Sequence, residues 1–161
     1  DKIVILEKGR ILEQGKTLQI LSSFSVAKKL GLRDLSSFIE ATVCNHAPDG
    51  ITELDFANSK LFLPKIDTPL GRKVRLRILA KDITLATNKP QKISALNILK
   101  GEVVEIILGS GPGAVIGIKV GNHKIITRIT QRSLKIMDLK LGKTCFAFLK
   151  SVSVATSDII V

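Results

Sequence analysis

The chain has 161 residues, of which 45% are hydrophobic and 24% are charged, and its formal net charge is +11. This balance is typical of a folded globular protein and excludes an intrinsically disordered chain. Residues 91–161 hold ten basic and four acidic residues, whereas residues 1–37 carry a net charge of +3 and residues 38–90 of +2. A basic excess favours an anionic partner, and we expect the anion-binding part within residues 91–161.

The composition also argues against other classes of protein. The only aromatic residues are six Phe, whereas binders of single-stranded nucleic acid usually need stacking platforms beside a basic groove. The two cysteines, Cys44 and Cys145, form no disulfide framework, and we expect them to be reduced core residues of a cytoplasmic protein. No apolar run reaches the ~18–20 residues that span a bilayer, and no signal peptide is visible. The sequence opens on Asp1 inside a strand-like pattern, which is typical of a fragment cut from a longer protein.

The first part of the chain predicts a hairpin and a helix. Residues 3–6 and 10–13 are short apolar runs separated by a turn at residues 8–9, and they predict two paired strands. Residues 23–32 predict a short helix that ends at Gly31.

From residue 39 onward the pattern predicts β-structure. Lys73, Arg75 and Arg77 alternate with apolar residues, which indicates a half-buried strand whose basic face is a solvated edge or contacts another domain. Residues 84–100 are expected to be irregular, and the Gly-rich run 109–113 is expected to be a hairpin turn, since no Gly-Lys-Ser/Thr follows it. A short helix is predicted over residues 131–139. The predicted strands are 39–44, 51–56, 60–63, 73–78, 102–108, 114–120, 124–129 and 144–154.

The two β regions are similar to each other. Both end in a Leu-Gly turn that leads into a last strand, at residues 70–71 and at residues 141–142. We therefore predict a mostly β fold with short helices, built from two small five-stranded barrels of the oligonucleotide/oligosaccharide-binding (OB) type.

The first 21 residues carry a resemblance of their own. The run DKIVILEKGRILEQG resembles the end of an ABC-transporter ATPase domain, which typically finishes with an apolar run, a Gly-Arg turn and Glu-x-Gly. From local sequence alone the same residues could form any β-hairpin.

Three later blocks resemble the molybdate-binding Mop or TOBE-type domain. They are Ile-Ser-Ala-Leu-Asn at 93–97, Ile-Thr-Arg-Ile-Thr-Gln-Arg-Ser at 126–133 and Leu-Lys-Ser-Val at 149–152, and residues 40–54 and 72–86 extend the match. Together with the ATPase-like start, the chain looks like the C-terminal part of a molybdate importer's ATP-binding subunit. The resemblance implies an ATPase tail and linker helix over 1–37, a first OB-like subdomain over 38–90 and a Mop/TOBE oxyanion-binding subdomain over 91–161.

Molybdate is a tetrahedral dianion with four acceptor oxygens, so its site needs converging hydroxyls, backbone N–H groups and cations. By resemblance, the residues that contact the oxyanion are Ser94, Ala95, Thr130, Ser133, Lys150 and Ser151. In that family the site lies between two subunits. Related domains often have Arg where this chain has Leu96, which removes one possible charge from the site.

Each of these residues also has a structural interpretation. Thr130 or Ser133 could cap the predicted helix, which is compatible with anion binding. In a strand, Lys150 and Ser151 would point to opposite faces, and Lys150 alone could be a solvated lysine. Asn97 is expected to form hydrogen bonds in a turn and not to touch the ligand.

The sequence gives little support for a metal site or a catalytic site. His46 and His123 lie in separate regions without a Cys or carboxylate at ligand spacing, so we expect no metal site. No nucleophile has a neighbouring base, and the ATPase motifs are absent, so we expect no enzyme activity and no cofactor in this chain, with ATP confined to the missing domain of the parent.

The resemblance implies a regulatory domain that senses cytoplasmic molybdate or tungstate as a homodimer, held at the inner face of the cell membrane by a permease subunit. A stand-alone molybdate storage or sensing module, an OB-like nucleic-acid-binding module and a docking domain without a ligand remain the alternatives.

Overall fold

The computed structural model describes residues 2–16 and 35–160. Its first two strands, β1 (Lys2–Glu7) and β2 (Arg10–Lys16), pair as an antiparallel hairpin. This hairpin confirms the two strands predicted near the start of the chain. The helix predicted over residues 23–32 lies outside the described residues.

The first five-stranded sheet combines four consecutive strands with one from the end of the described chain. Its order is β12-β6-β3-β4-β5, and every pair of neighbours is antiparallel. In β6, Val74, Leu76 and Ile78 face the core while Lys73 and Arg75 are exposed, as the alternating sequence predicts. The strands are β3 (Ser36–His46), β4 (Ile51–Phe56), β5 (Ser59–Pro64), β6 (Lys73–Leu79) and β12 (Ile159–Ile160).

The second five-stranded sheet has the order β10-β9-β8-β11-β7, and its neighbours are also antiparallel. The helix α3 (Gln131–Ile136) connects β10 to β11. The strands are β7 (Thr84–Ala86), β8 (Asn97–Leu108), β9 (Gly113–Val120), β10 (His123–Thr130) and β11 (Thr144–Leu149).

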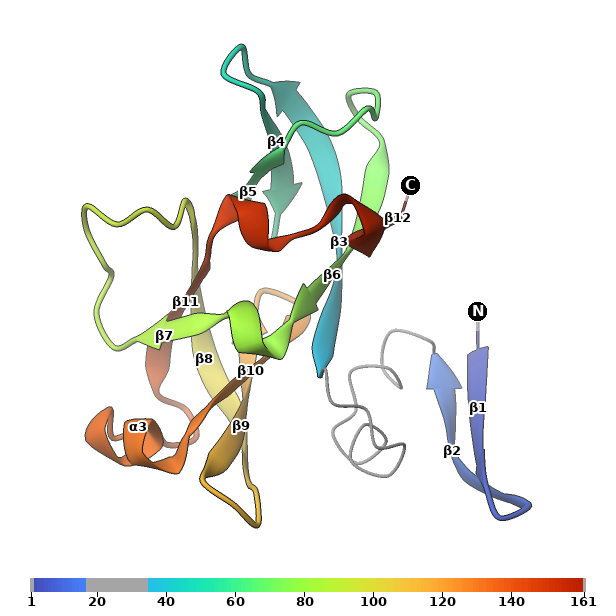
Figure 1. Ribbon diagram of the computed structural model, residues 1–161, viewed down its shortest axis with the longest axis vertical. Coiled ribbons are helices and arrows are strands. Elements are labelled where there is room, and N and C mark those ends of the chain that lie inside the picture. The colour runs from blue at the N-terminus through green and yellow to red at the C-terminus, as the bar shows by residue number, and fades with distance from the viewer. Residues whose placement is uncertain (1, 17–34, 161) are drawn as a thin grey trace.

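The two sheets have the same strand order and exchange their fifth strands. After β6 the chain passes through a 3-10 turn, η1 (Ala80–Asp82), and then adds β7 to the second sheet. After β11 it passes through η2 (Ser151–Ser153) and η3 (Thr156–Asp158), and then adds β12 to the first sheet. Figure 1 shows this last segment in red, running from β11 to β12 beside β6. Each half of the fold therefore depends on a strand from the other half.

The two halves share one turn down to its individual hydrogen bonds. Gly71 N donates to Val43 O over 2.8 Å, and Gly142 N donates to Val103 O over the same distance. Each valine N–H in turn donates to the carbonyl of the residue after its glycine, over 2.9 and 3.0 Å. Both glycines have positive φ angles, 79° and 81°, which side chains disfavour. The predicted repeat is confirmed, and these glycines are counterparts 71 residues apart.

Two buried polar side chains tie the sheets to each other. Ser37 Oγ in β3 accepts a hydrogen bond from Ile126 N in β10 over 2.7 Å. Asn97 in β8 is bonded twice to Phe62 in β5: Oδ1 accepts from N over 2.6 Å, and Nδ2 donates to O over 3.0 Å. The expectation that Asn97 lies in a turn is therefore wrong, because it begins β8 and satisfies the backbone of the facing sheet.

One large hydrophobic core spans both sheets. It joins fully buried side chains of the first sheet, such as Leu54 and Leu61, to those of the second, such as Ile116 and Ile118. This arrangement is a mostly β, OB-like fold, as the sequence predicts. The solvated-edge interpretation of the basic strand needs correction, because β12 pairs with β6 on one side and β3 pairs with it on the other.

Several predicted boundaries differ from those in the structure. The stretch 84–100 is only partly irregular, since it contains β7 and the start of β8. The last long strand ends at Leu149 and not at residue 154, because Ser153 N bonds Lys150 O over 3.0 Å and closes a 3-10 turn. The helix predicted over 131–139 ends at Ile136 and is followed by Asp138 at a φ of 46°, which is not helical.

The cysteines differ in their surroundings. Cys145 is a free, fully buried thiol whose pKa is raised by burial, as expected for a core residue. Cys44 is only partly buried, because the pairing of β3 with β4 shifts register between Val43 and Asn45. Its thiol donates to Glu53 O over 3.2 Å, and Lys60 Nζ lies 2.9 Å from its sulfur. Within residues 2–16 and 35–160, no helix has the length and apolar character to span a membrane.

Candidate oxyanion site

Four of the six predicted site residues lie at one end of the second sheet. Leu149, the last residue of β11, pairs with Asn97, the first residue of β8. Lys150 and Ser151 therefore follow β11 at the same end at which the residues before Asn97 enter β8. Ser94 and Lys150 are exposed, and Ala95 and Ser151 are buried. We call Ser94, Ala95, Lys150 and Ser151 the Ser151 group.

Ser151 carries the most informative atom of this group. Its side chain is 8% exposed, and among the described residues its Oγ is the one buried side-chain nitrogen or oxygen without a hydrogen-bond partner. Leaving a buried hydroxyl unpaired costs about 1–3 kcal/mol. An anionic ligand with acceptor oxygens would accept a hydrogen bond from this hydroxyl and relieve that cost.

The backbone at this point differs from the strand that the sequence predicts. Lys150 is the cap residue of η2, with φ −71° and ψ 144°, and Ser151 is the first residue of the 3-10 turn. Strand alternation therefore does not place these two side chains on opposite faces.

Thr130 and Ser133 form the second group, which we call the α3 pair. Thr130 Oγ1 accepts a hydrogen bond from Ser133 N over 2.9 Å, and the two hydroxyl oxygens lie 2.8 Å apart. Thr130 is therefore the N-cap of α3, which confirms the predicted capping role. Both hydroxyls are at the surface, and either of them can donate the hydrogen atom between them.

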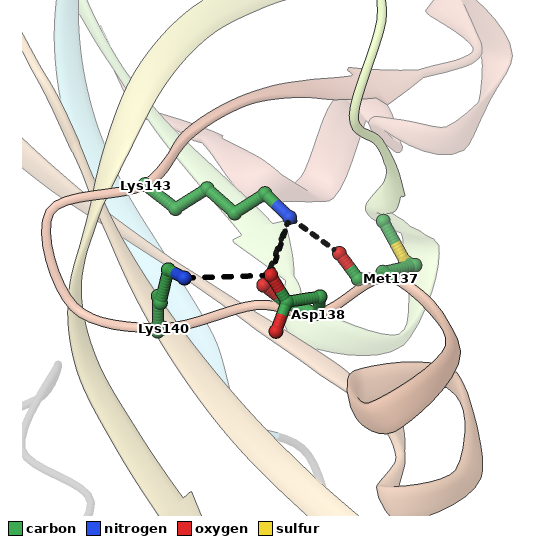
Figure 2. Close-up of polar contacts among 4 residues, drawn as sticks. All are labelled: Met137, Asp138, Lys140 and Lys143. Carbon is green, nitrogen blue, oxygen red and sulfur yellow. Dashed lines mark hydrogen bonds and ion pairs between the residues drawn. The ribbon is translucent and has the colours of Figure 1, made fainter.

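A lysine side chain binds backbone carbonyls just beyond the C-terminal end of α3. Lys143 Nζ donates to Met137 O over 2.8 Å and to Asp138 O over 2.9 Å, as Figure 2 shows. Lys140 Nζ lies 3.5 Å from Asp138 Oδ2. Lys140 and Lys143 lower the pKa of Asp138, the first mainly through its charge and the second mainly through a hydrogen bond. This cluster anchors a helix of only six residues to the start of β11.

One chain does not bring the two groups together. Thr130 pairs with Gly113, next to the pairing of Leu108 with Ala114 at the far end of β8. The Ser151 group lies at the near end, beside Asn97, so the 12-residue strand separates the groups. Figure 1 shows α3 and the red turn after β11 well apart. A site containing all six residues requires the α3 pair of another chain.

The first half of the fold lacks the corresponding polar residues. The 71-residue offset of the paired glycines makes Leu79 and Ala80 the counterparts of Lys150 and Ser151. The reciprocal bonds to Phe62 and Ile126 make those two residues counterparts. Counting onward from them along the sequence, Ile66 and Pro69 correspond to Thr130 and Ser133. Only the second half therefore carries hydroxyls and a lysine at these positions.

Basic residues lie close in sequence to both groups. Lys89 and Lys92 precede Ser94, and Arg128 and Arg132 flank Thr130; all four side chains are exposed. No acidic residue occurs within 87–101 or within 128–137. Sequence analysis passed over these cations, although the two long stretches without Asp or Glu could have shown them.

The histidines have structural partners. His46 Nε2 lies 2.9 Å from Thr68 O, and its Nδ1 lies 3.0 Å from Thr52 Oγ1. The His123 ring packs against Phe56, with ring centroids 4.7 Å apart. Across the described ranges, no three His, Cys, Asp or Glu side chains gather as metal ligands would.

The family model of the TOBE domain matches residues 93–156, a range that contains all six predicted site residues. Residues 93–156 are therefore similar to a TOBE domain, and this matched range holds β8 to β11, α3 and η2.

Relatives cover nearly the whole chain. It is 32% identical over 152 residues to the molybdenum import ATP-binding protein ModC of Mesorhizobium japonicum, and the match covers 94% of this chain and 41% of that protein. ModC of Rhizobium etli is 34% identical, with 95% and 43% covered, and ModC of Escherichia coli K12 is 30% identical, with 96% and 44% covered. The chain spans less than half the length of these curated relatives. The resemblance to molybdate importer ATP-binding subunits is confirmed.

A solved structure shares the fold. The cytoplasmic molybdate-binding protein ModG, in a crystal form with molybdate bound, superposes with a TM-score of 0.64 at 22% identity. The match covers 78% of this chain and 95% of ModG. At this identity, the likeness establishes the fold.

Proposed function

We propose that this chain is the molybdate-sensing, regulatory part of an importer's ATP-binding subunit, and that its TOBE domain binds molybdate or tungstate. The unpaired, buried hydroxyl of Ser151 carries this proposal, because it is a donor that the folded chain leaves without an acceptor. The similarity to ModC proteins and the shared fold of a molybdate-binding protein support the choice of ligand. Catalysis is assigned to no residue of this chain, and ATP would bind elsewhere in the parent subunit.

The site is proposed to form between two copies of the chain. The Ser151 group of one copy and the α3 pair of the other would together supply the six predicted residues. Apolar side chains support such an interface, since Leu96 and Val152 are exposed beside the Ser151 group and Leu108 and Ile136 are exposed near the α3 pair. An isologous dimer would hold two equivalent sites.

Regulation follows from a site shared by two subunits. If transport requires the two copies to separate or rotate, bound oxyanion favours the state in which the site is assembled. High cytoplasmic molybdate would then restrain the importer, whose permease subunit would hold this chain at the inner face of the membrane. Tungstate, with the same charge and shape, would act similarly.

Calorimetric titration with molybdate, tungstate, sulfate and phosphate, together with light scattering, tests the proposal. We expect saturable molybdate binding of at most about one ion per chain, on a dimer. Ser94→Ala combined with Lys150→Ala should abolish this binding, whereas the control Lys100→Ala, at an exposed lysine of β8, should retain it. Binding that survives the double substitution would contradict the site, and a folded dimer that binds no oxyanion would contradict the function and leave a docking domain.

A further inference from the structure

The segment that carries Ser151 connects the second sheet to the first. It leaves the second sheet at Leu149 and reaches the first sheet at Ile159, and η2 and η3 occupy most of the interval. Among the described residues, Ile159 and Ile160 of β12 pair with β6, and three residues of β7 pair with β11 in the other half. The connection that carries the proposed site is therefore tied to the first sheet by this short strand.

An ion pair fastens this segment directly before β12. Arg77 Nη1 of β6 lies 3.4 Å from Asp158 Oδ1. Arg77 Nε also donates to Ser36 Oγ of β3 over 3.3 Å. The Asp158 side chain is 16% exposed and that of Arg77 is 39% exposed, so the pair is partly shielded from solvent. The guanidinium therefore joins the end of the segment to two strands of the first sheet.

In the other half of the fold, a side-chain hydroxyl holds the connecting segment against a strand. There Thr127 Oγ1 lies 2.8 Å from Ile83 O and 3.3 Å from Ala80 O, which pins η1 to β10. Counting along β5 and β10 from Phe62 and Ile126, the counterpart of Thr127 is Leu63, which has no hydroxyl to donate to η2. The counterpart of Arg77 is Phe148, which carries no charge. The two connections thus have polar anchors of different kinds, and the segment with Ser151 is held by the ion pair in addition to the burial of Val154.

We propose that Arg77 and Asp158 are positioning residues that hold η2 in place, so that Ser151 and Lys150 meet the oxyanion in the bound geometry. We call this ion pair, Arg77 with Asp158, the latch. The inference rests on the proposed function. It adds that ligand affinity depends on this ion pair, which lies in the first sheet and not at the site itself. Without the latch, binding must first order the segment, and that ordering weakens affinity.

Substitutions on one face of β6 provide a matched test. Arg77→Met and Asp158→Asn each remove the latch, and the charge-swapped double variant, Arg77→Asp with Asp158→Arg, restores opposite charges. Lys73→Met is the control, because Lys73 lies on the same face of β6 and forms an exposed ion pair with Glu40 over 2.8 Å. The readouts are molybdate affinity by calorimetry and amide hydrogen exchange of residues 150–160.

We expect both single variants to weaken molybdate binding about 3- to 10-fold, as ordering one or two mobile groups would. Exchange over 150–160 should become faster, and the swapped pair should recover part of the affinity. Lys73→Met should stay within about twofold of the wild type, since exposed ion pairs contribute little. Unchanged affinity in both single variants, or an equal loss in Lys73→Met, would overturn the proposal.

Hydrogen exchange separates failure of the latch from failure of the proposed function. A wild-type chain that binds no molybdate would contradict the function, and the latch would then be judged by exchange alone. Exchange that is unchanged by Arg77→Met and by Asp158→Asn would overturn the latch in that case too.

Discussion

At the scale of single residues, two buried serines differ in whether their hydroxyl has a hydrogen-bond partner, and this difference separates a structural role from a proposed binding role. Ser37 and Ser151 are 0% and 8% exposed, and only the first has a partner, the N–H of Ile126. A sequence does not distinguish them, because both are Ser residues at the margin of a β-strand. Ser37 holds the two sheets together, and Ser151 keeps an unpaired donor at the cost of some stability.

The pair predicts opposite effects of the same substitution. Ser151→Ala should leave the free energy of unfolding unchanged or raise it, because it removes an unpaired buried hydroxyl, and it should weaken molybdate binding. Ser37→Ala should lower the free energy of unfolding by about 1–3 kcal/mol, because it leaves the N–H of Ile126 unpaired. Urea denaturation measures both changes. Equal destabilisation by the two variants would show that the Ser151 hydroxyl does have a partner.

At the scale of elements, α3 shows which end of a helix local sequence determines. Thr130 at the N-cap and Ser133 three residues later are a local pattern, and the start of the helix is where the sequence predicts it. The end is earlier than predicted: Asp138 has a φ of 46°, and Lys143, beyond the helix, donates to the carbonyls of Met137 and Asp138. That contact joins segments on either side of a turn and has no signature in the helix itself.

The two lysines of this cluster should therefore differ in their contribution to stability. Lys143 is 27% exposed, whereas Lys140 is 72% exposed. Figure 2 shows that Lys143 reaches the carbonyls of Met137 and Asp138, whereas Lys140 contacts the carboxylate of Asp138. Lys143→Met should lower the free energy of unfolding by about 1–2 kcal/mol, because charged hydrogen bonds to α3 are lost. Lys140→Met should change it by less than about 0.5 kcal/mol. Similar losses in both variants, measured by thermal unfolding, would refute this assignment.

At the scale of the whole molecule, the exchanged strands and the shared core make the halves interdependent. β7 belongs to the second sheet and β12 to the first, so a cut between residues 90 and 91 removes one strand from each sheet. The apolar cluster that contains Leu54 and Ile118 would be divided as well. The division into 38–90 and 91–161 follows the sequence repeat and remains a prediction for the boundaries of folding units.

Separate expression of the two halves tests this interdependence. Residues 38–90 and residues 91–161 should each lack a cooperative thermal transition when expressed alone, because each exposes apolar core and a sheet edge. Residues 35–161, which keep both exchanged strands, should unfold in a single transition. Circular dichroism on heating provides the measurement, and a sharp transition in either isolated half would show that its own strands suffice.

The sequence by itself determined the local features of this protein. Alternation along residues 73–78, the Leu-Gly turns and the Thr130 cap depend on neighbours in the chain, so the strands, the repeat and the start of α3 could be predicted. The six candidate site residues came from resemblance to a family, and their role remains a proposal. Tertiary structure alone decided that β12 joins β6, that Asn97 bonds Phe62 and that Ser151 is buried without a partner. These features join residues far apart in the chain, where pairing depends on the packing of the whole fold and not on local pattern.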